Sequence, residues 1–401
     1  MPLAALVVDR KLMVKHLVIS EDWSPKVGGA HFWVENTYRR WPDQVEVLTA
    51  TRLTFNAEQV GATKPSVNSC ESISVKRILA PVHTISFNSK CWRSIFENVL
   101  KVRRSLSRKS TSIHCKAYFP EGLVGALAKR SSDKVSKLIV YAHGEEINVA
   151  KSSRLLRLIA KWVYDSADLV IANSRNTERM VQSLVGAATI TVIHPGVDVA
   201  RVQSAGERRS QVRSKYSWSE DSFVVLTIAR LEPRKNVVRV IDALHRLREE
   251  GETIRYVVVG RGEALPAIQA KIKEHGAQDW VTLIEHVTEY EKFELLNAAD
   301  VFVMASISHG LMVEGFGIVF LEAAAAGLLS VSGNDGGQCE AVLNGVTGFN
   351  VDGNSTDEIR GGIIKILRDR DNAFMMQAQA KAWAEHNDWS EVVAKTIRAV
   401  G

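Results

Sequence analysis

The sequence of 401 residues predicts an α/β protein built from two Rossmann-like domains in series. Three observations support this fold class. Short runs typical of buried strands alternate with longer runs typical of helices along the chain. The chain is too long for one ordinary hydrophobic core. Its composition, 46% hydrophobic and 24% charged, is typical of a globular protein.

The alternating elements form two successive blocks. In the first block we expect strands over 15–20, 45–49, 73–78, 112–116, 137–142 and 168–172, and helices over 30–40, 92–106, 121–130, 152–164 and 174–184. In the second block we expect strands over 223–228, 254–259, 280–284, 300–304 and 328–332, and helices over 236–249, 264–275, 289–298, 317–326 and 355–368. Such alternation predicts parallel sheets wrapped by helices.

The boundary between the blocks is expected just after 194–198, where Pro195-Gly196 ends a strand and polar residues follow. We therefore predict a first domain over 1–199 and a second over 200–385. Residues 1–12 are expected to be an unstructured leader, unless Met13 is the natural start.

Ligands of open parallel sheets bind beyond the carboxyl ends of the strands. This rule predicts that several post-strand loops surround one cleft. These loops lie at 21–30, 143–148, 230–236, 260–263 and 306–317.

One segment is large enough to account for the net charge of +6. Residues 89–109 contain seven Lys or Arg residues and one acidic residue, Glu97. Apolar residues about three and four apart lie between these charges: Trp92, Ile95, Phe96, Val99, Leu100 and Val102. A basic amphipathic helix with a tryptophan can bind an anionic membrane surface. The alternative is a solvated helix that packs on its domain through the same apolar stripe.

Composition also argues against several classes. No apolar run approaches the roughly eighteen residues of a membrane-spanning helix. Cys70, Cys91, Cys115 and Cys339 are scattered without metal or disulfide spacing, which favours reduced thiols in a cytosolic protein. No known nucleic-acid-binding motif accompanies the basic segment, so we expect no nucleic-acid partner.

The most informative stretch covers residues 313–322. Glu314 and Glu322 stand eight residues apart, with Gly315 and Gly317 between them. The glycines let a backbone approach a small polar ligand, and the run that follows has helix-forming composition. A helix N-terminus offers unpaired N–H groups to a phosphate. The alternative is a glycine turn before a buried helix with two incidental glutamates.

Neighbouring motifs favour the ligand-binding interpretation. The stretch resembles the E-x7-E motif of the retaining glycosyltransferases of family GT4. Residues 336–340 and 344–349 resemble that family's GG-x-x-E and D/N-G-x-T-G turns, in order and at the expected spacing. Residues 229–236 resemble its G-R-L-x-x-x-K-G/N loop. The chain is thus identified as resembling a GT4 enzyme over nearly its whole length.

The resemblance implies the GT-B fold, with a cleft between an acceptor-side first domain and a nucleotide-sugar-binding second domain. Its last helix, over 386–401, would return to the first domain. The implied reaction moves a hexose, with mannose favoured, from a nucleotide diphosphate-sugar to a hydroxyl of a glycan or lipid-linked acceptor, with retention. We expect no metal and no cofactor, since no Asp-x-Asp site is apparent.

Many GT4 enzymes act on lipid-linked acceptors, which favours the membrane interpretation of residues 89–109. The expected location is therefore cytoplasmic, with peripheral binding to the inner face of the membrane.

The resemblance also assigns roles to single residues. Glu314 would contact the donor sugar, and Glu322 the ribose. Backbone N–H groups would hold the sugar and phosphates, from Gly315, Phe316, Gly317 and Ile318.

Arg230 and Lys235 lie in a loop before a helix start, where the dipole favours an anionic partner. They would neutralise the leaving diphosphate. His143, directly after the strand 137–142, resembles the family's active-site histidine near the donor sugar. Gly28 and Gly29 would let the first post-strand loop approach the diphosphate or the acceptor.

The donor stays open at this point. Residues 313–319, with a longer loop before them, resemble GDP-mannose-using enzymes, but UDP-glucose and UDP-N-acetylglucosamine enzymes share much of this pattern. A nucleotide-sugar epimerase of the same overall fold and a non-catalytic subunit that only binds the donor are further alternatives. A nicotinamide dehydrogenase is disfavoured, because Gly260 and Gly262 lack the third glycine of the dinucleotide fingerprint.

Overall fold

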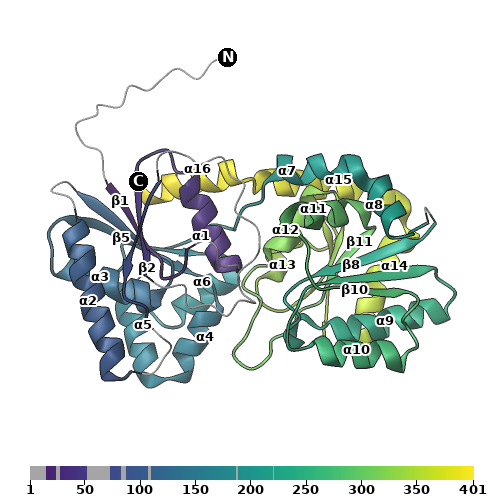
Figure 1. Ribbon diagram of the computed structural model, residues 1–401, viewed down its shortest axis with the longest axis horizontal. Coiled ribbons are helices and arrows are strands. Elements are labelled where there is room, and N and C mark those ends of the chain that lie inside the picture. Colours follow the sequence, from purple (N-terminus) through teal and green to yellow (C-terminus); the bar gives the residue numbers. More distant parts are fainter. Residues whose placement is uncertain are drawn as a thin grey trace, which may run out of the picture.

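A computed structural model describes residues 15–23, 28–51, 73–82, 87–106, 110–186, 188–219 and 221–401. The expected leader over 1–12, and Arg108 and Lys109 of the basic segment, lie outside the described residues. Figure 1 shows two α/β domains side by side along the long axis of the molecule. The predicted fold class, two Rossmann-like domains in series, is confirmed.

The first domain contains a seven-stranded parallel sheet in the order β3-β2-β1-β4-β5-β6-β7. Its strands are β1 (Lys15–Ile19), β2 (Val45–Ala50), β3 (Ile73–Leu79), β4 (Thr111–Cys115), β5 (Val135–Ala142), β6 (Leu169–Ala172) and β7 (Ile190–Val192). The six strands predicted for this half are confirmed. β7 was not predicted, because three residues are too few to show a strand pattern.

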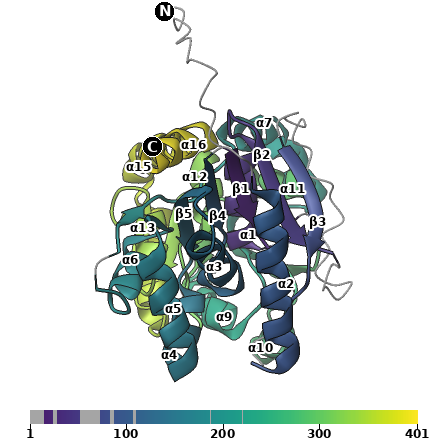
Figure 2. The same cartoon turned by 90° about the vertical axis from the view of Figure 1, so that its left-hand side faces the viewer.

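Helices pack on both faces of this sheet. They are α1 (Gly29–Arg39), α2 (Ser89–Ser105), α3 (Leu123–Arg130), α4 (Glu145–Ser152), α5 (Arg154–Ser166) and α6 (Arg175–Gln182), with a π-helical turn η3 (Tyr118–Gly122) before α3. Figure 2 shows α2, α4 and α5 at the same end of the domain.

The loop predicted over 143–148 is wrong in part, because α4 starts at Glu145. Gly144 precedes it with a φ of 113°, a conformation that favours glycine. Glu145 and Glu146 occupy the first turn, where the helix dipole stabilises anions. Ser153 then accepts a hydrogen bond from the Leu156 N–H and starts α5 as a separate helix.

The basic helix α2 divides the predicted apolar stripe between two surroundings. Ile95, Val99 and Val102 are buried against the first domain, as the packing alternative expects. Trp92 and Phe96 face outward, with 43% and 63% of their surface exposed. Within the described ranges, no helix is long and apolar enough to cross a membrane.

The second domain contains a six-stranded parallel sheet in the order β10-β9-β8-β11-β12-β13. Its strands are β8 (Phe223–Ile228), β9 (Ile254–Val259), β10 (Val281–Ile284), β11 (Val301–Met304), β12 (Ser330–Gly333) and β13 (Gly348–Val351). Its helices are η5 (Pro233–Lys235), α9 (Val237–Glu249), α10 (Leu265–Glu274), α11 (Glu289–Ala298), α12 (Ile318–Ala325), α13 (Gln338–Ala341), α14 (Thr356–Arg368) and α15 (Arg370–His386). The five strands and five helices predicted for this half are confirmed.

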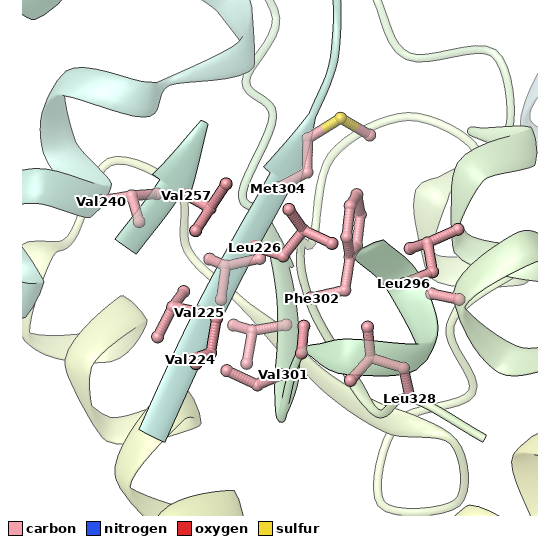
Figure 3. Close-up of a cluster of buried hydrophobic side chains, with 14 of the residues drawn as sticks. Val224, Val225, Leu226, Val240, Val257, Leu296, Val301, Phe302, Met304 and Leu328 are labelled. Atoms are coloured by element: carbon pink, nitrogen blue, oxygen red, sulfur yellow. The ribbon is translucent and has the colours of Figure 1, made fainter. Parts of the chain in front are cut away.

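The hydrophobic core of the second domain is centred on its two middle strands. Figure 3 shows Val224–Leu226 of β8 beside Val301 and Phe302 of β11, all fully buried. Val240 and Leu296 come from α9 and α11. Such near-continuous apolar strands are typical of a parallel sheet covered on both faces. The core therefore fixes the carboxyl ends of β8 and β11, from which the loops of the site begin.

Two connections join the domains. The first runs from β7 through α7 (Val199–Ser204), the 3₁₀ turn η4 (Ala205–Arg208) and α8 (Arg209–Lys215). In the second, α16 (Trp389–Val400) lies over the first domain in Figure 1, with the Trp389 and Phe32 ring centroids 5.8 Å apart. The exact domain limits, 1–199, 200–385 and 386–401, stay a prediction.

Candidate functional site

Glu314 forms ion pairs with two cations of the second domain. Its Oε2 lies 3.0 Å from Arg234 Nη1 and also contacts Lys235 Nζ. The Glu314 side chain is only 11% exposed. Burial raises the pKa of this carboxyl, but Lys235 and Arg234 outweigh that effect and hold the pKa below its ordinary value. Glu314 is therefore a fixed carboxylate at neutral pH.

The turn after β8 decides which cations meet Glu314. Pro233–Lys235 form a single 3₁₀ turn, and Asn236 follows in the left-handed conformation with a φ of 62°. The Asn236 side chain donates to the carbonyls of Ala305 and Gly353, at 3.1 and 2.6 Å. These bonds tie the turn to the loops after β11 and β13. The turn therefore directs the side chains of Arg234 and Lys235 toward Glu314.

Arg230, the other predicted cation, does not contact Glu314. Its side chain is 67% exposed and pairs with Glu232 at 2.7 Å. Arg234, which the sequence analysis missed, takes the place beside Lys235 and is 4% exposed. Its position directly before Lys235 in the loop motif was the available signal.

Arg234 also joins the two domains. Its Nη2 lies 3.1 Å from Oε1 of Glu145, in the first turn of α4. Nearby, Asn148 Nδ2 donates to the Leu311 carbonyl at 3.0 Å. The loop 306–317 therefore packs against the start of α4 in the first domain.

Gly315 lies directly against His143 of the first domain. A Cβ atom at Gly315 would lie 2.3 Å from the His143 carbonyl oxygen and 2.8 Å from Asn173 Nδ2. Asn173 Nδ2 in turn donates to that carbonyl at 2.9 Å. Only glycine permits so close an approach between the two backbones.

His143 is held in one tautomer. Its Nε2 donates to the Lys116 carbonyl at 2.7 Å, so its buried Nδ1 is an acceptor, and Nδ1 has no hydrogen-bond partner among the described residues. Burial lowers the pKa of His143 to about 4. His143 is therefore a neutral imidazole at neutral pH, with a buried acceptor at the domain interface that is unpaired within the described part of the chain.

Glu322 lies in the second turn of α12, and its Oε1 is 2.5 Å from Lys292 Nζ of α11. Gly317 precedes the helix with a φ of 89°, a conformation that favours glycine. At the opposite side of the interface, α1 starts at Gly29, whose added Cβ would lie 4.0 Å from Ile318 Cδ1. The N-termini of α1 and α12 therefore meet. A Cβ added at Gly28 would meet no atom of the described residues within 4 Å.

A second charged cluster, missed by the sequence analysis, adjoins His143. Lys116 Nζ lies 2.9 Å from Asp22 Oδ2 and 3.4 Å from Glu121 Oε1. Burial, with Glu121 next in effect, raises the pKa of Glu21 to about 7. The pair Glu21-Asp22, directly after the first strand, was the available signal.

No group of three or more His, Cys, Asp or Glu residues in the described part of the chain is arranged to hold a metal ion.

Family models match both halves of the chain. Residues 27–201 match the model described as Glycosyltransferase Family 4, and residues 208–383 match the model described as Glycosyl transferases group 1. A "GDP-mannose-dependent alpha-(1-6)-phosphatidylinositol monomannoside mannosyltransferase" of Mycobacterium tuberculosis is 33% identical over 264 residues, which are 65% of this chain and 68% of the relative. A "GDP-mannose-dependent monoacylated alpha-(1-6)-phosphatidylinositol monomannoside mannosyltransferase" of Corynebacterium glutamicum is 27% identical over 384 residues, 94% of each chain.

Solved structures share the fold. Anabaena Alr3699/HepE, crystallised with UDP and glucose, superposes with a TM-score of 0.77 at 21% identity, covering 97% of this chain and 99% of that one. Sucrose-phosphate synthase from Thermosynechococcus elongatus superposes with a TM-score of 0.76 at 18% identity, covering 96% and 98%. The GT-B fold expected from the sequence is confirmed.

Proposed function

The chain belongs to glycosyltransferase family 4, and from this premise we propose that it moves a hexose from a nucleoside diphosphate-sugar to an acceptor hydroxyl, with retention at the anomeric carbon. Mannose is the favoured hexose. One observation carries the proposal: the paired carboxylate of Glu314 lies in a loop that touches His143 of the other domain through Gly315.

The charges around Glu314 are suited to stabilise the breaking of the bond between the sugar and the diphosphate. In such a transfer the sugar gains positive charge at its anomeric carbon, while the diphosphate leaves with negative charge. A fixed carboxylate stabilises the first charge, and nearby cations stabilise the second. We assign Glu314 to the donor sugar, and Lys235 and Arg230 to the diphosphate. Lys235 and Arg234 together keep Glu314 ionised, and Arg234 also holds it in place.

Binding groups surround these charges. We assign the ribose to Glu322, which would exchange part of its contact with Lys292 for the ribose hydroxyls. The start of α12 offers unpaired N–H groups to the phosphates, as helix N-termini do. These groups belong to Gly315, Phe316, Gly317 and Ile318. Gly28 and Gly29 place no side chain at the point where the start of α1 faces α12.

His143 and the leaving phosphate complete the mechanism. The Nδ1 acceptor of His143 would bind a hydroxyl of the donor sugar near the reacting carbon. The departing phosphate takes the acceptor proton on the same face of the sugar, which leaves the anomeric configuration retained. We propose that neither a metal ion nor a cofactor takes part, because cationic side chains supply the charge that neutralises the leaving group.

The donor proposed first is GDP-mannose. The relatives from M. tuberculosis and C. glutamicum carry this donor in their names. UDP-glucose is the alternative, supported by the Anabaena protein that was crystallised with it. The Anabaena structures are only 20% and 21% identical to this chain, so they support the fold more than the donor. UDP-N-acetylglucosamine and an epimerase reaction are the remaining alternatives.

The acceptor proposed first is a mannosylated phosphoinositide or a related lipid-linked glycan, since the same relatives are named for such an acceptor. This choice agrees with the outward-facing side of α2. Trp92 and Phe96 are exposed there, beside Lys90, Arg93, Arg103 and Arg104. Apolar rings beside cations suit the surface of an anionic bilayer. We propose peripheral binding at the cytoplasmic face of the membrane.

The experiment incubates the protein with a panel of GDP- and UDP-sugars, a lipid acceptor and EDTA, and measures nucleotide release and glycosylated product. We expect release and transfer with one donor, GDP-mannose first, and no loss in EDTA. Isomerised donor without acceptor would favour the epimerase. Failure to bind any nucleotide-sugar would overturn the proposal.

A further inference from the structure

Glu340 of the second domain reaches the N-terminus of a helix in the first domain. It lies in α13, and its carboxylate accepts the N–H groups of Arg175 at 2.8 Å and of Asn176 at 3.1 Å. The Ser174 hydroxyl accepts the Thr177 N–H at 3.1 Å. The first N–H groups of a helix have no partner within that helix. The second domain therefore completes the cap of α6.

The turn before α13 also holds the loop of Glu314. The Gly337 N–H donates to the Glu314 carbonyl at 2.8 Å. A Cβ at Gly337 would lie 2.0 Å from the Gly315 carbonyl oxygen and 2.9 Å from Ser174 Oγ. Gly315 in turn touches His143. A continuous series of close backbone contacts therefore runs from the cap of α6 through Gly337 and Gly315 to the proposed site.

The same carboxylate contacts the chain that links the domains. His194 Nε2, between β7 and α7, lies 3.2 Å from Glu340 Oε2, and its ring stacks on Phe316 with centroids 4.8 Å apart. Burial raises the pKa of Glu340, but the bonds from His194, Arg175 and Asn176 outweigh it and hold the pKa below its usual value. The group is thus an anion at a helix N-terminus, where the helix dipole stabilises it.

We propose that Glu340 is a positioning residue for the transfer reaction. By capping α6 across the interface, it docks the second domain so that Glu314 and Gly315 are seated against His143. When the domains part, α6 loses two acceptors and Glu340 loses three donors. The cap therefore favours the closed arrangement, in which water is excluded from the site. The kinetic part of this inference rests on the proposed function.

The kinetic experiment compares Glu340→Ala and Glu340→Gln with wild type. We expect Glu340→Ala to lower kcat about tenfold, the rate equivalent of one lost cap. Nucleotide affinity should stay unchanged, since the hydrogen bonds of Glu340 among the described residues go to Arg175, Asn176 and His194 and not to groups assigned to the donor. The fraction of donor lost to hydrolysis should rise. Glu340→Gln keeps the shape of the side chain and one acceptor, so its kcat should lie between those of wild type and Glu340→Ala. Glu358→Gln, at the start of α14 within one domain, is the control.

A second variant tests the contact from the other side, in case Glu340→Ala does not fold. Arg175→Pro removes one N–H from α6 at its first position, where proline is tolerated, and Arg175→Ala keeps that N–H. We expect the proline variant alone to reduce kcat. The losses from Arg175→Pro and Glu340→Gln should be less than additive in the double variant. Additive losses would contradict a direct coupling.

A closure assay separates this inference from the proposed function. We would introduce cysteines at Asn148, whose side chain donates to the Leu311 carbonyl across the interface, and at Leu311, and use the rate of their cross-linking as the measure of closure. We expect slower cross-linking after Glu340→Ala, with or without GDP. If wild type transfers no hexose, the proposed function fails while this assay still tests Glu340. Unchanged cross-linking and unchanged kcat in Glu340→Ala would overturn the inference.

Discussion

Arg234 of the second domain and Glu145 of the first domain form an ion pair across the interface, with 3.1 Å between Nη2 and Oε1. The same guanidinium lies 2.8 Å from Glu232 and 3.0 Å from Glu314. One nearly buried cation therefore binds three carboxylates and both domains. The planar guanidinium can do this because its N–H groups point in several fixed directions.

Replacing Arg234 by lysine should test whether its pairing with three carboxylates is needed for transfer. A lysine ammonium cannot reach three carboxylates at once, so part of the negative charge would stay buried and unpaired. We expect the kcat/KM of transfer to fall by roughly tenfold to a hundredfold, typical of losing a fixed charge contact. Arg246→Lys, in an exposed pair with Asp357, is the control and should retain full activity. Equal activity of the two variants would contradict the role given to Arg234.

The pKa of His143 predicts a pH dependence of stability. Burial lowers the pKa of His143 to about 4 in the folded protein, below the ordinary value of 6.5 that applies to the unfolded chain. Between these values the unfolded state holds more protons, so the free energy of unfolding falls as the pH is lowered. The contribution is at most about 1.4 kcal/mol per pH unit. Above about pH 6.5 His143 is neutral in both states, so its titration no longer lowers the free energy of unfolding.

Denaturant unfolding across this pH range should be measured for wild type and His143→Gln. The glutamine amide can still donate to the Lys116 carbonyl but does not titrate. We expect a shallower slope in the variant. The comparison is necessary because burial also lowers the pKa values of His16 and His114. Identical slopes would show that His143 titrates normally in the folded protein.

Glu322→Gln should weaken recognition of the ribose. A hydrogen bond to a charged group contributes about 1.5–3 kcal/mol, so we expect nucleotide affinity to fall by at least about tenfold. Wild type should discriminate against a 2′-deoxy nucleoside diphosphate, and the variant should discriminate much less. Calorimetric titration of both nucleotides measures this. An undiminished preference for the ribose in the variant would exclude Glu322 from that contact.

The outward side of α2 should bind anionic vesicles. Replacing Trp92 and Phe96 by serine removes the exposed rings, and neutralising Lys101, Arg103 and Arg104 removes charge. We expect each set to reduce co-sedimentation with phosphatidylinositol vesicles, and the charge set to matter less in high salt. Phe374→Ser is a matched control, since Phe374 is 73% exposed on α15 of the other domain. An equal loss in the control would argue against specific binding through α2.

The sequence alone was sufficient to predict the fold class and most strands and helices, but not the short helices α4 and α13 beside the proposed site. Strong alternation of apolar strands and amphipathic helices explains this success. α15 was missed, because its buried positions are mainly small residues such as Ala380 and Ala384, which hardly contrast with their neighbours. β13 spans only four residues, Gly348–Val351, and was noticed only as part of a turn motif.

Contacts across the interface were beyond the reach of sequence reasoning. Arg230, Arg234 and Lys235 are all cationic residues of one loop, and the sequence does not distinguish them. Only the 3₁₀ turn and the left-handed Asn236 decide which of them meet Glu314. Glu340 belongs to a recognised motif, but its partners at Arg175 and Asn176 depend on how the domains dock. The roles of the site residues stay predictions.

The most direct test of the account is the transfer rate of Glu314→Gln with the donor that wild type uses. The amide keeps the shape of the side chain but removes the charge that we assign to stabilising the anomeric carbon. We predict that transfer falls by about a hundredfold or more, while GDP binding measured by calorimetry remains. A variant that transfers hexose at the wild-type rate would contradict the central claim that this carboxylate stabilises the reacting sugar.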